Sequence, residues 1–192
     1  PNEDVTYQAQ WRKNSYLVQF VSEGTVLREY TLSYGDAIPA QEKPTREGYT
    51  FVSWDKNVPD TVSDENVKNG KLVFQAVWKE IAYTISYDLA GGSLPTGKTN
   101  PTTFTINSKP MDLVQPKREG YTFEGWSGTD IKEKDTQVTV TARPLKDRTY
   151  TANWKENSYT IVFNVEGEVT RGEMKNIPLR YTQETTIPEN GY

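Results

Sequence analysis

A block of sequence recurs 72 residues later, and this repeat limits the possible folds more than any other feature of the chain. Residues 44–54 read PTREGYTFVSW, and residues 116–126 read PKREGYTFEGW. The proline, the Arg-Glu-Gly-Tyr-Thr-Phe run and the final tryptophan keep their spacing in both copies. A recurrence with this period is typical of tandem modules. The 192-residue chain is therefore expected to fold as small modules and not as one large domain.

Two further patterns recur around this block and predict strands. Each module is expected to begin with an opening strand, in which aromatic and β-branched residues alternate, at residues 16–20, 83–87 and 159–163. Each is expected to end with a closing strand, in which an aromatic, an alanine and a tryptophan alternate, at residues 7–11, 74–78 and 150–154. Alternate residues share one face of a strand, so each strand has one apolar face. Turn residues follow each opening strand and predict a hairpin to a second strand at residues 25–32, 102–106 and 179–182.

The recurring block itself predicts a turn that enters a strand. Gly48 and Gly120 come directly before large strand residues, which is expected of a turn with positive φ. Trp54 and Trp126 lie three positions after a phenylalanine, so they have the wrong parity for its face of the strand. Either a bulge at 52–53 and 124–125 restores that face or the indoles cover the opposite face. We favour the bulge, because Gly125 suits one.

The remaining segments are polar and predict mostly loops. Residues 33–43 and 107–115 contain prolines and allow at most a short helix or 3₁₀ turn, whereas residues 137–140 predict an additional strand in the second module. The expected organisation has four parts, which are the C-terminal strand of a preceding repeat, two whole modules and the N-terminal part of a further repeat. Their boundaries are 1–14, 15–81, 82–157 and 158–192.

Composition excludes several classes of function. The formal charge is −4, and lysine and arginine are scattered singly, which argues against a nucleic-acid partner. The chain contains no cysteine and no histidine, so thiolate catalysis, disulfides and the commonest zinc ligands are excluded. No apolar run is long enough to predict a membrane span. We assign no catalytic, metal-binding or cofactor-binding residue and no cofactor, and the ligand-binding residues remain unknown.

Four sets of residues are weighed as sites. Asp55, Asp60, Asp64 and Glu65 are the densest acidic group, but they lack the spacing of a calcium loop and are interpreted as a solvated loop. Asp88 is interpreted as capping its own turn. Glu47 and Glu119 beside Arg46 and Arg118 are interpreted as weak surface electrostatics. For glycan binding the sequence needs exposed aromatics, and Tyr30, Tyr34 and Tyr181 are the least committed to a core.

The Pro-x-Arg-Glu-Gly-Tyr-Thr-Phe-x-x-Trp block, the YTISYDLAGG run at 83–92 and the YTANW close at 150–154 resemble the internalin B-type repeat, also called the Listeria–Bacteroides repeat. The resemblance covers essentially the whole chain. It implies tandem β-grasp (ubiquitin-like) modules of a β-rich α+β class, with a mixed sheet and at most a short helix each. Ser53 in place of glycine and the VSEG turn at 21–24 depart from the pattern.

The resemblance implies a non-catalytic stalk or spacer of an exported bacterial surface protein, with an adhesion role. The alternatives are a glycan- or host-protein-binding module and an accessory module of a secreted enzyme. The expected partners are neighbouring repeats, and residues 158–192 of one chain pairing with 1–13 of the next would give head-to-tail self-association. A Lys–Asn isopeptide bond is a further hypothesis, which an intact mass equal to that of the unmodified sequence would exclude.

Overall fold

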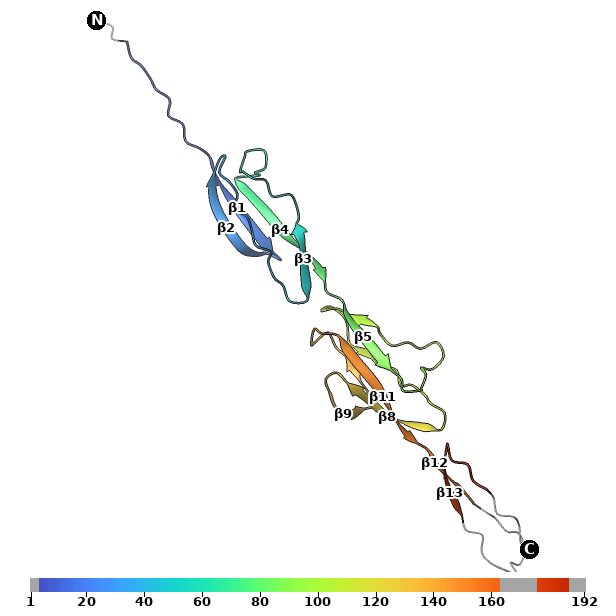
Figure 1. Ribbon diagram of the computed structural model, residues 1–192. Coiled ribbons are helices and arrows are strands. Elements are labelled where there is room, and N and C mark those ends of the chain that lie inside the picture. The colour runs from blue at the N-terminus through green and yellow to red at the C-terminus, as the bar shows by residue number, and fades with distance from the viewer. Residues whose placement is uncertain (1–3, 163–175, 187–192) are drawn as a thin grey trace, which may run out of the picture. The chain divides into compact units, whose positions relative to one another are not determined.

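A computed structural model describes residues 4–162 and 176–186, and every regular element in those residues is a β-strand (Figure 1). The chain divides into two compact units, Pro1–Ile81 and Ala82–Tyr192. The first unit contains β1 (Ser15–Ser22), β2 (Thr25–Ser33), β3 (Tyr49–Trp54) and β4 (Lys71–Glu80). The second unit contains β5 (Tyr83–Asp88), β6 (Thr103–Phe104), β7 (Met111–Asp112), β8 (Tyr121–Gly128), β9 (Ile131–Asp135), β10 (Thr139–Val140), β11 (Arg148–Glu156), β12 (Ser158–Ile161) and β13 (Ile177–Arg180).

The sheet of the first unit has the strand order β2-β1-β4-β3. The opening strand β1 pairs antiparallel with β2 and parallel with the closing strand β4, and β4 pairs antiparallel with β3. Alternation places Val18 and Phe20 of β1 beside Leu72 and Phe74 of β4 in one buried cluster. Ile38 and Val62 add to this core from the loops. The predicted apolar faces of the opening and closing strands therefore form one core.

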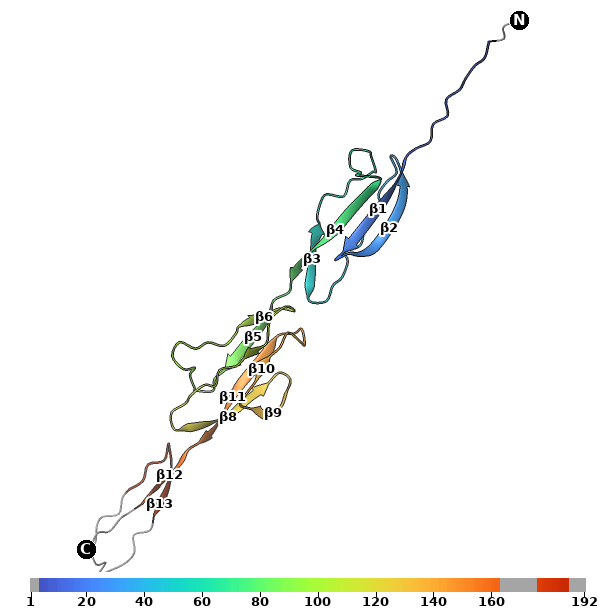
Figure 2. The same cartoon turned by 180° about the vertical axis from the view of Figure 1, so that it is seen from behind.

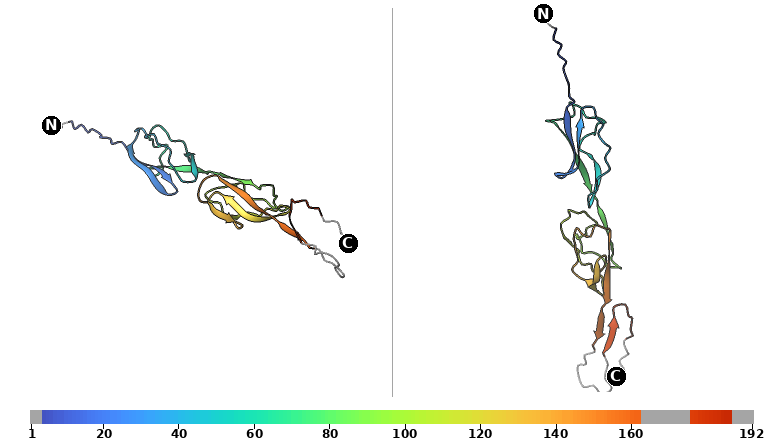
Figure 3. Two further views of the ribbon diagram at one scale, coloured as in Figure 1. Left: turned by 60° about the horizontal axis from the view of Figure 1, so that its bottom comes forward. Right: turned by 90° about the vertical axis from the view of Figure 1, so that its left-hand side faces the viewer.

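The second unit repeats this arrangement with one more edge strand. Its main sheet has the order β6-β5-β11-β8-β9, in which β11 is parallel to β5 and antiparallel to β8 (Figures 2 and 3). A separate two-stranded ribbon joins β7 to β10, so the additional strand expected at 137–140 is confirmed at Thr139 and Val140. The core gathers around Trp126, which has 0% of its surface exposed, together with Phe104, Tyr150 and Val140.

The predicted bulge is present in both units. In the first, Phe51 pairs with Trp78 and Ser53 with Val77, which leaves Val52 as the additional residue. In the second, Phe123 pairs with Trp154 and Gly125 with Asn153, which leaves Glu124. The bulge returns each motif tryptophan to the core cluster of its unit. A phenylalanine lies between the two indoles, with Phe123 5.6 Å from Trp126 and 5.5 Å from Trp154 between ring centroids.

The helical part of the expected α+β class is wrong for the described residues, which contain no helix. Residues 33–43 and 107–115 were expected to allow a short helix, but the first segment runs as irregular chain after β2, and the second contains only the short strand β7. Their backbone groups bond across to the loops that follow the motif: Ile38 N donates to Asp60 O at 2.9 Å, and Leu113 N donates to Val138 O at 2.8 Å. These segments satisfy their amides with a neighbouring loop, so an internal helix is not needed.

The flanking parts follow the prediction only partly. Ser158–Ile161 pairs with Ile177–Arg180, which shifts the expected strand 179–182 toward the N-terminus, and residue 163 of the opening strand lies outside the described residues. The closing strand expected at 7–11 is not formed. In both complete sheets this strand lies between an opening strand and a motif strand, and residues 7–11 pair with neither. Tyr7 and Trp11 are both 91% exposed, and head-to-tail pairing through them remains a prediction.

Candidate functional site

The recurring motif builds the same tight turn in both units. Tyr49 N donates to Arg46 O at 3.1 Å, and Gly48 at the third position of the turn has φ 76°. Tyr121 N donates to Arg118 O at 3.2 Å, and Gly120 has φ 74°. This φ at the third position defines a type II turn and favours glycine. The predicted positive φ is therefore confirmed, and the turn directs the chain into the motif strand.

The motif arginine stacks on the motif tyrosine across this turn. The Arg46 guanidinium carbon lies 3.6 Å from the ring centroid of Tyr49, and that of Arg118 lies 3.8 Å from Tyr121. Such cation–π contacts suit arginine, because its planar guanidinium stacks on an aromatic ring and remains charged. Sequence reasoning missed this role, although an arginine three positions before a tyrosine across a turn glycine is a readable signal. Contacts between residues of the motif itself therefore stabilise its turn.

The motif arginines also bind groups outside the turn. Arg46 Nη1 forms an ion pair with Glu23 Oε1 at 2.7 Å, and Arg118 Nη1 donates to Ala90 O at 3.0 Å. Both partners lie in the loop after the opening strand. Each motif arginine thus connects the start of the motif strand, β3 or β8, to the loop that follows the opening strand of its unit, β1 or β5. The arginines act in the folding of the repeat rather than as isolated surface charges.

The acidic candidates each make a separate structural hydrogen bond. Asp55 Oδ1 accepts from Gln75 N at 2.8 Å, Asp64 accepts from the Tyr16 hydroxyl, and Asp88 Oδ1 accepts from Ala90 N at 2.8 Å. The Asp64 contact raises the pKa of Tyr16, because a phenol that donates to a carboxylate holds its proton. The self-capping of Asp88 is confirmed. Within residues 4–162 and 176–186, no group of acidic side chains is arranged to hold a metal ion.

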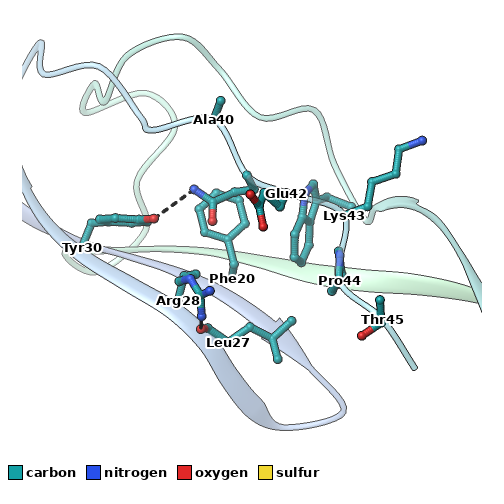
Figure 4. A pocket seen from close by; sticks show the side chains of 11 residues that line it. Phe20, Leu27, Arg28, Tyr30, Ala40, Glu42, Lys43, Pro44 and Thr45 are labelled. Atoms are coloured by element: carbon teal, nitrogen blue, oxygen red, sulfur yellow. Dashed lines mark hydrogen bonds between the residues drawn. The ribbon is translucent and has the colours of Figure 1, made fainter. Parts of the chain in front are cut away.

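The first unit has an open groove beside its motif tryptophan. The groove has a volume of about 560 Å³ and lies between β2, the segment 40–45 and the core (Figure 4). Phe20, Tyr30 and Trp54 give it an aromatic wall. The polar lining comes from Arg28, Gln41, Glu42 and Lys43. Aromatic faces beside a few hydrogen-bonding groups are a chemistry that can stack a sugar ring or a flat side chain.

Some of the polar groups in this groove are already engaged. Gln41 Nε2 donates to Tyr30 Oη at 3.2 Å and to Pro39 O at 2.6 Å, which fixes the amide across the opening. Arg28 Nη1 donates to Leu27 O at 2.8 Å. The Phe20 and Trp54 ring centroids lie 4.9 Å apart, so this wall is part of the core as well. Of the three tyrosines that were least committed to a core, Tyr30 alone lines the groove, whereas Tyr34 and Tyr181 are partly exposed elsewhere.

The second unit buries a charged residue that the sequence did not identify. Arg148 is 4% exposed, stacks 4.2 Å from the centroid of Phe104, and donates through Nη2 to Thr141 O and Pro144 O, both at 2.9 Å. Its Nε is buried without a partner, as is Nε1 of Trp126. Strand register places Arg148 where the first unit has Leu72. The arginine holds the loop before β11 closed over the core.

Comparisons with known proteins identify similar repeats. The model of the Listeria-Bacteroides repeat domain matches residues 16–76 and again residues 83–153. Two proteins of Evansella cellulosilytica are similar over nearly the whole chain. One, whose name describes a Gly-rich membrane protein, is 29% identical over 97% of the chain and 22% of its own length. The other, also named as a membrane protein, is 24% identical over 99% of the chain and 29% of its own length.

A third similar protein is Internalin H of Listeria monocytogenes, which is 30% identical over 46% of the chain and 15% of its own length. The chain thus spans less than a third of each of these relatives. No solved structure matches the chain. Within the described ranges, no helix combines the length and the apolar character that crossing a membrane requires.

Proposed function

Because the chain belongs to the Listeria–Bacteroides repeat domain family, we propose that it is a non-catalytic spacer segment of an exported bacterial surface protein. The observation that carries this proposal is that the motif, the most distinctive part of the sequence, is used inside each repeat. Its arginine, glycine, tyrosine and tryptophan form a turn and a core, and the groove that the motif borders in the first unit is open.

Further parts of the proposal concern the architecture. We propose the boundaries 15–81 and 82–157 for the two whole repeats, with parts of neighbouring repeats at 1–14 and 158–192. We also propose that each repeat is a β-grasp module without its helix. A central parallel pair of the first and last main strands, flanked by antiparallel neighbours, supports this. The membrane-protein names of two relatives and the name Internalin H support a place at the cell surface.

The spacer proposal is tested by inserting residues 1–192 between a surface anchor and a reporter domain on a bacterial cell. The matched control replaces them with a flexible Gly/Ser linker of equal length, which contracts as a random coil. We expect a bulky antibody to reach the reporter better with the folded repeats, and better still with two tandem copies. Equal accessibility with the repeats and with the flexible linker would contradict a spacer function.

The groove of the first unit favours a second candidate, which is binding of a glycan or of a host-protein segment. Trp54 lines this groove, whereas Trp126 at the same position of the second unit is fully buried. Titration of tryptophan fluorescence against a glycan array tests the candidate. Binding would quench the parent and the Tyr83→Ala variant alike, and Tyr30→Ala would reduce the affinity. The absence of reproducible quenching by any glycan would contradict glycan binding in this groove.

A further inference from the structure

The turn glycine of the second repeat lies directly against a residue of the following strand pair. Gly120 has φ 74°, and a Cβ placed on it would lie 2.0 Å from ring carbons of Tyr181, which is a severe clash. Tyr181 comes directly after β13, and its ring also meets that of Tyr121 edge to face at 6.1 Å between centroids. One face of Tyr181 thus covers the glycine turn, while 42% of the residue stays exposed.

Backbone hydrogen bonds hold this contact in place. Asn157 N donates to Gly120 O at 2.9 Å, and Tyr181 N donates to Asn157 O at 3.2 Å. The side chain of Asn157 joins the same group, because Thr122 Oγ1 donates to Asn157 Oδ1 at 2.6 Å. Asn157 therefore bonds on one side to the motif turn and on the other to the strand pair that follows. The linker between them is a fixed bridge.

A carboxylate of the closing strand adds a second attachment. Glu156 Oε1 accepts from Thr182 N at 3.1 Å and from Thr182 Oγ1 at 2.5 Å. The Thr182 hydroxyl bond, followed by the backbone bond, lowers the pKa of Glu156. Burial, followed by the nearby Glu119 carboxylate, raises the pKa of Tyr181. Two residues in succession, Tyr181 and Thr182, thus contact the preceding repeat.

Strand register places a tyrosine at the position of Tyr181 in the first repeat as well. β1 pairs Ser15 with Ser33 as β12 pairs Ser158 with Arg180, so Tyr34 occupies the place of Tyr181. Tyr34 N donates to Asn14 O at 2.9 Å, which matches the bond from Tyr181 to Asn157. A tyrosine after the second strand, bonded to the asparagine of the linker, is therefore a feature of two strand pairs in this chain.

We propose that the turn glycine Gly120 is a socket for Tyr181, the residue that follows the second strand of the next repeat, and that this contact stiffens the joint between the two. Tyr34, whose backbone bonds to Asn14 as that of Tyr181 bonds to Asn157, is the corresponding residue of the first repeat. The proposal rests on the spacer function and explains how a connection of one residue between β11 and β12, Asn157, carries a defined joint. It also assigns glycine at position 120 a role beyond its φ, since any side chain there displaces the tyrosine.

The test compares two glycines of the second unit by amide hydrogen exchange in the whole chain. Gly97 has φ 73° and open space around its Cα, so Gly97→Ala adds backbone strain alone. Gly120→Ala adds the same strain and also excludes the Tyr181 ring. We expect Gly120→Ala to reduce the protection of the Tyr181 and Thr182 amides about tenfold more than Gly97→Ala does. Equal losses in the two variants would overturn the proposal.

Removing the ring provides the second arm. Tyr181→Ala should reduce protection of β12 and β13 while β5 and β11 keep theirs, and in that background Gly120→Ala should cost no more than Gly97→Ala. Tyr34→Ala is the matched control, because Tyr34 is 49% exposed, and it should leave the protection of β1 and β2 unchanged. Unchanged protection of β12 and β13 in Tyr181→Ala would overturn the joint even if Gly120→Ala fails to fold. Because reporter display measures spacing and exchange measures the joint, the two proposals fail separately.

Discussion

The two whole repeats share a strand order and a motif, yet they bury that motif to different extents. Trp126 is fully buried, whereas Trp54 lines an open groove. The difference follows from the segment after the motif. In the second repeat it forms β9, whose Asp135 pairs with Trp126, and in the first repeat residues 55–70 form no strand. One family pattern thus specifies the sheet, and loop sequence decides how completely the core is closed.

The largest expected effect comes from truncating the buried indole. Trp126→Ala should destabilise the second repeat by about 3–5 kcal/mol, because it leaves a large cavity in a closed core. Trp54→Ala should cost the first repeat roughly 1–2 kcal/mol, because the groove already exposes part of the ring. Urea unfolding of each variant measures both. Similar losses at the two positions would show that the repeats close their cores equally.

The next effect concerns the glycine beneath β9. Gly125 has φ 125°, and an added Cβ would lie 2.8 Å from backbone atoms of Asp135, so Gly125→Ser should cost about 1–3 kcal/mol. The first repeat carries Ser53 at this position. The reverse change, Ser53→Gly, should therefore alter stability by less than about 1 kcal/mol. Chemical unfolding of the matched pair checks this, and a harmless Gly125→Ser would mean that β9 can move away.

Arg148 and Leu72 test a second difference between the cores. Arg148→Leu copies the first repeat into the second and removes two hydrogen bonds to the 141–144 loop. We expect a loss of about 1–3 kcal/mol, because the carbonyls of Thr141 and Pro144 lose their donor. The measurement is urea unfolding together with exchange at residues 141–147. A variant as stable as the parent would show that a leucine closes this core as well as the arginine does.

The smallest effect is electrostatic and belongs to the bulge. Lys134 Nζ lies 2.7 Å from Glu124 Oε2, and this hydrogen bond lowers the pKa of Glu124 below its ordinary value of 4.5. Because the folded state has the lower pKa, the pair stabilises at higher pH and this contribution is lost as pH falls below 4.5. The first repeat has Val52 at the bulge and lacks this dependence.

Thermal unfolding of the parent and of Glu124→Gln measures this contribution. The parent should melt slightly higher at about pH 7, and the difference should shrink as the pH falls below 4.5, because protonation of Glu124 removes its charge. Val52→Gln is the control in the first repeat and should show no such convergence. A difference that persists at low pH would assign the effect of Glu124 to packing and not to charge.

Much of the fold could be predicted from the chain because its strands alternate strictly. The parity break before Trp54 and Trp126 sufficed to predict the bulges. The loops were not predictable in the same way. Residues 33–43 have no periodicity, and the amides of Gly35 and Ile38 find their partners in a distant loop, at Val62 and Asp60. The groove depends equally on the absence of a strand like β9 from residues 55–70. The stacking of Arg46 on Tyr49 was missed, although the predicted glycine turn between them was a signal for it.

The most direct test of two repeats with separate cores is amide hydrogen exchange on the whole chain, resolved by repeat, for Trp54→Ala and Trp126→Ala. We predict that Trp126→Ala reduces protection in β5, β8 and β11 and leaves β1 and β4 unchanged, and that Trp54→Ala does the reverse to a smaller extent. Loss of protection across both repeats from either substitution would contradict the account.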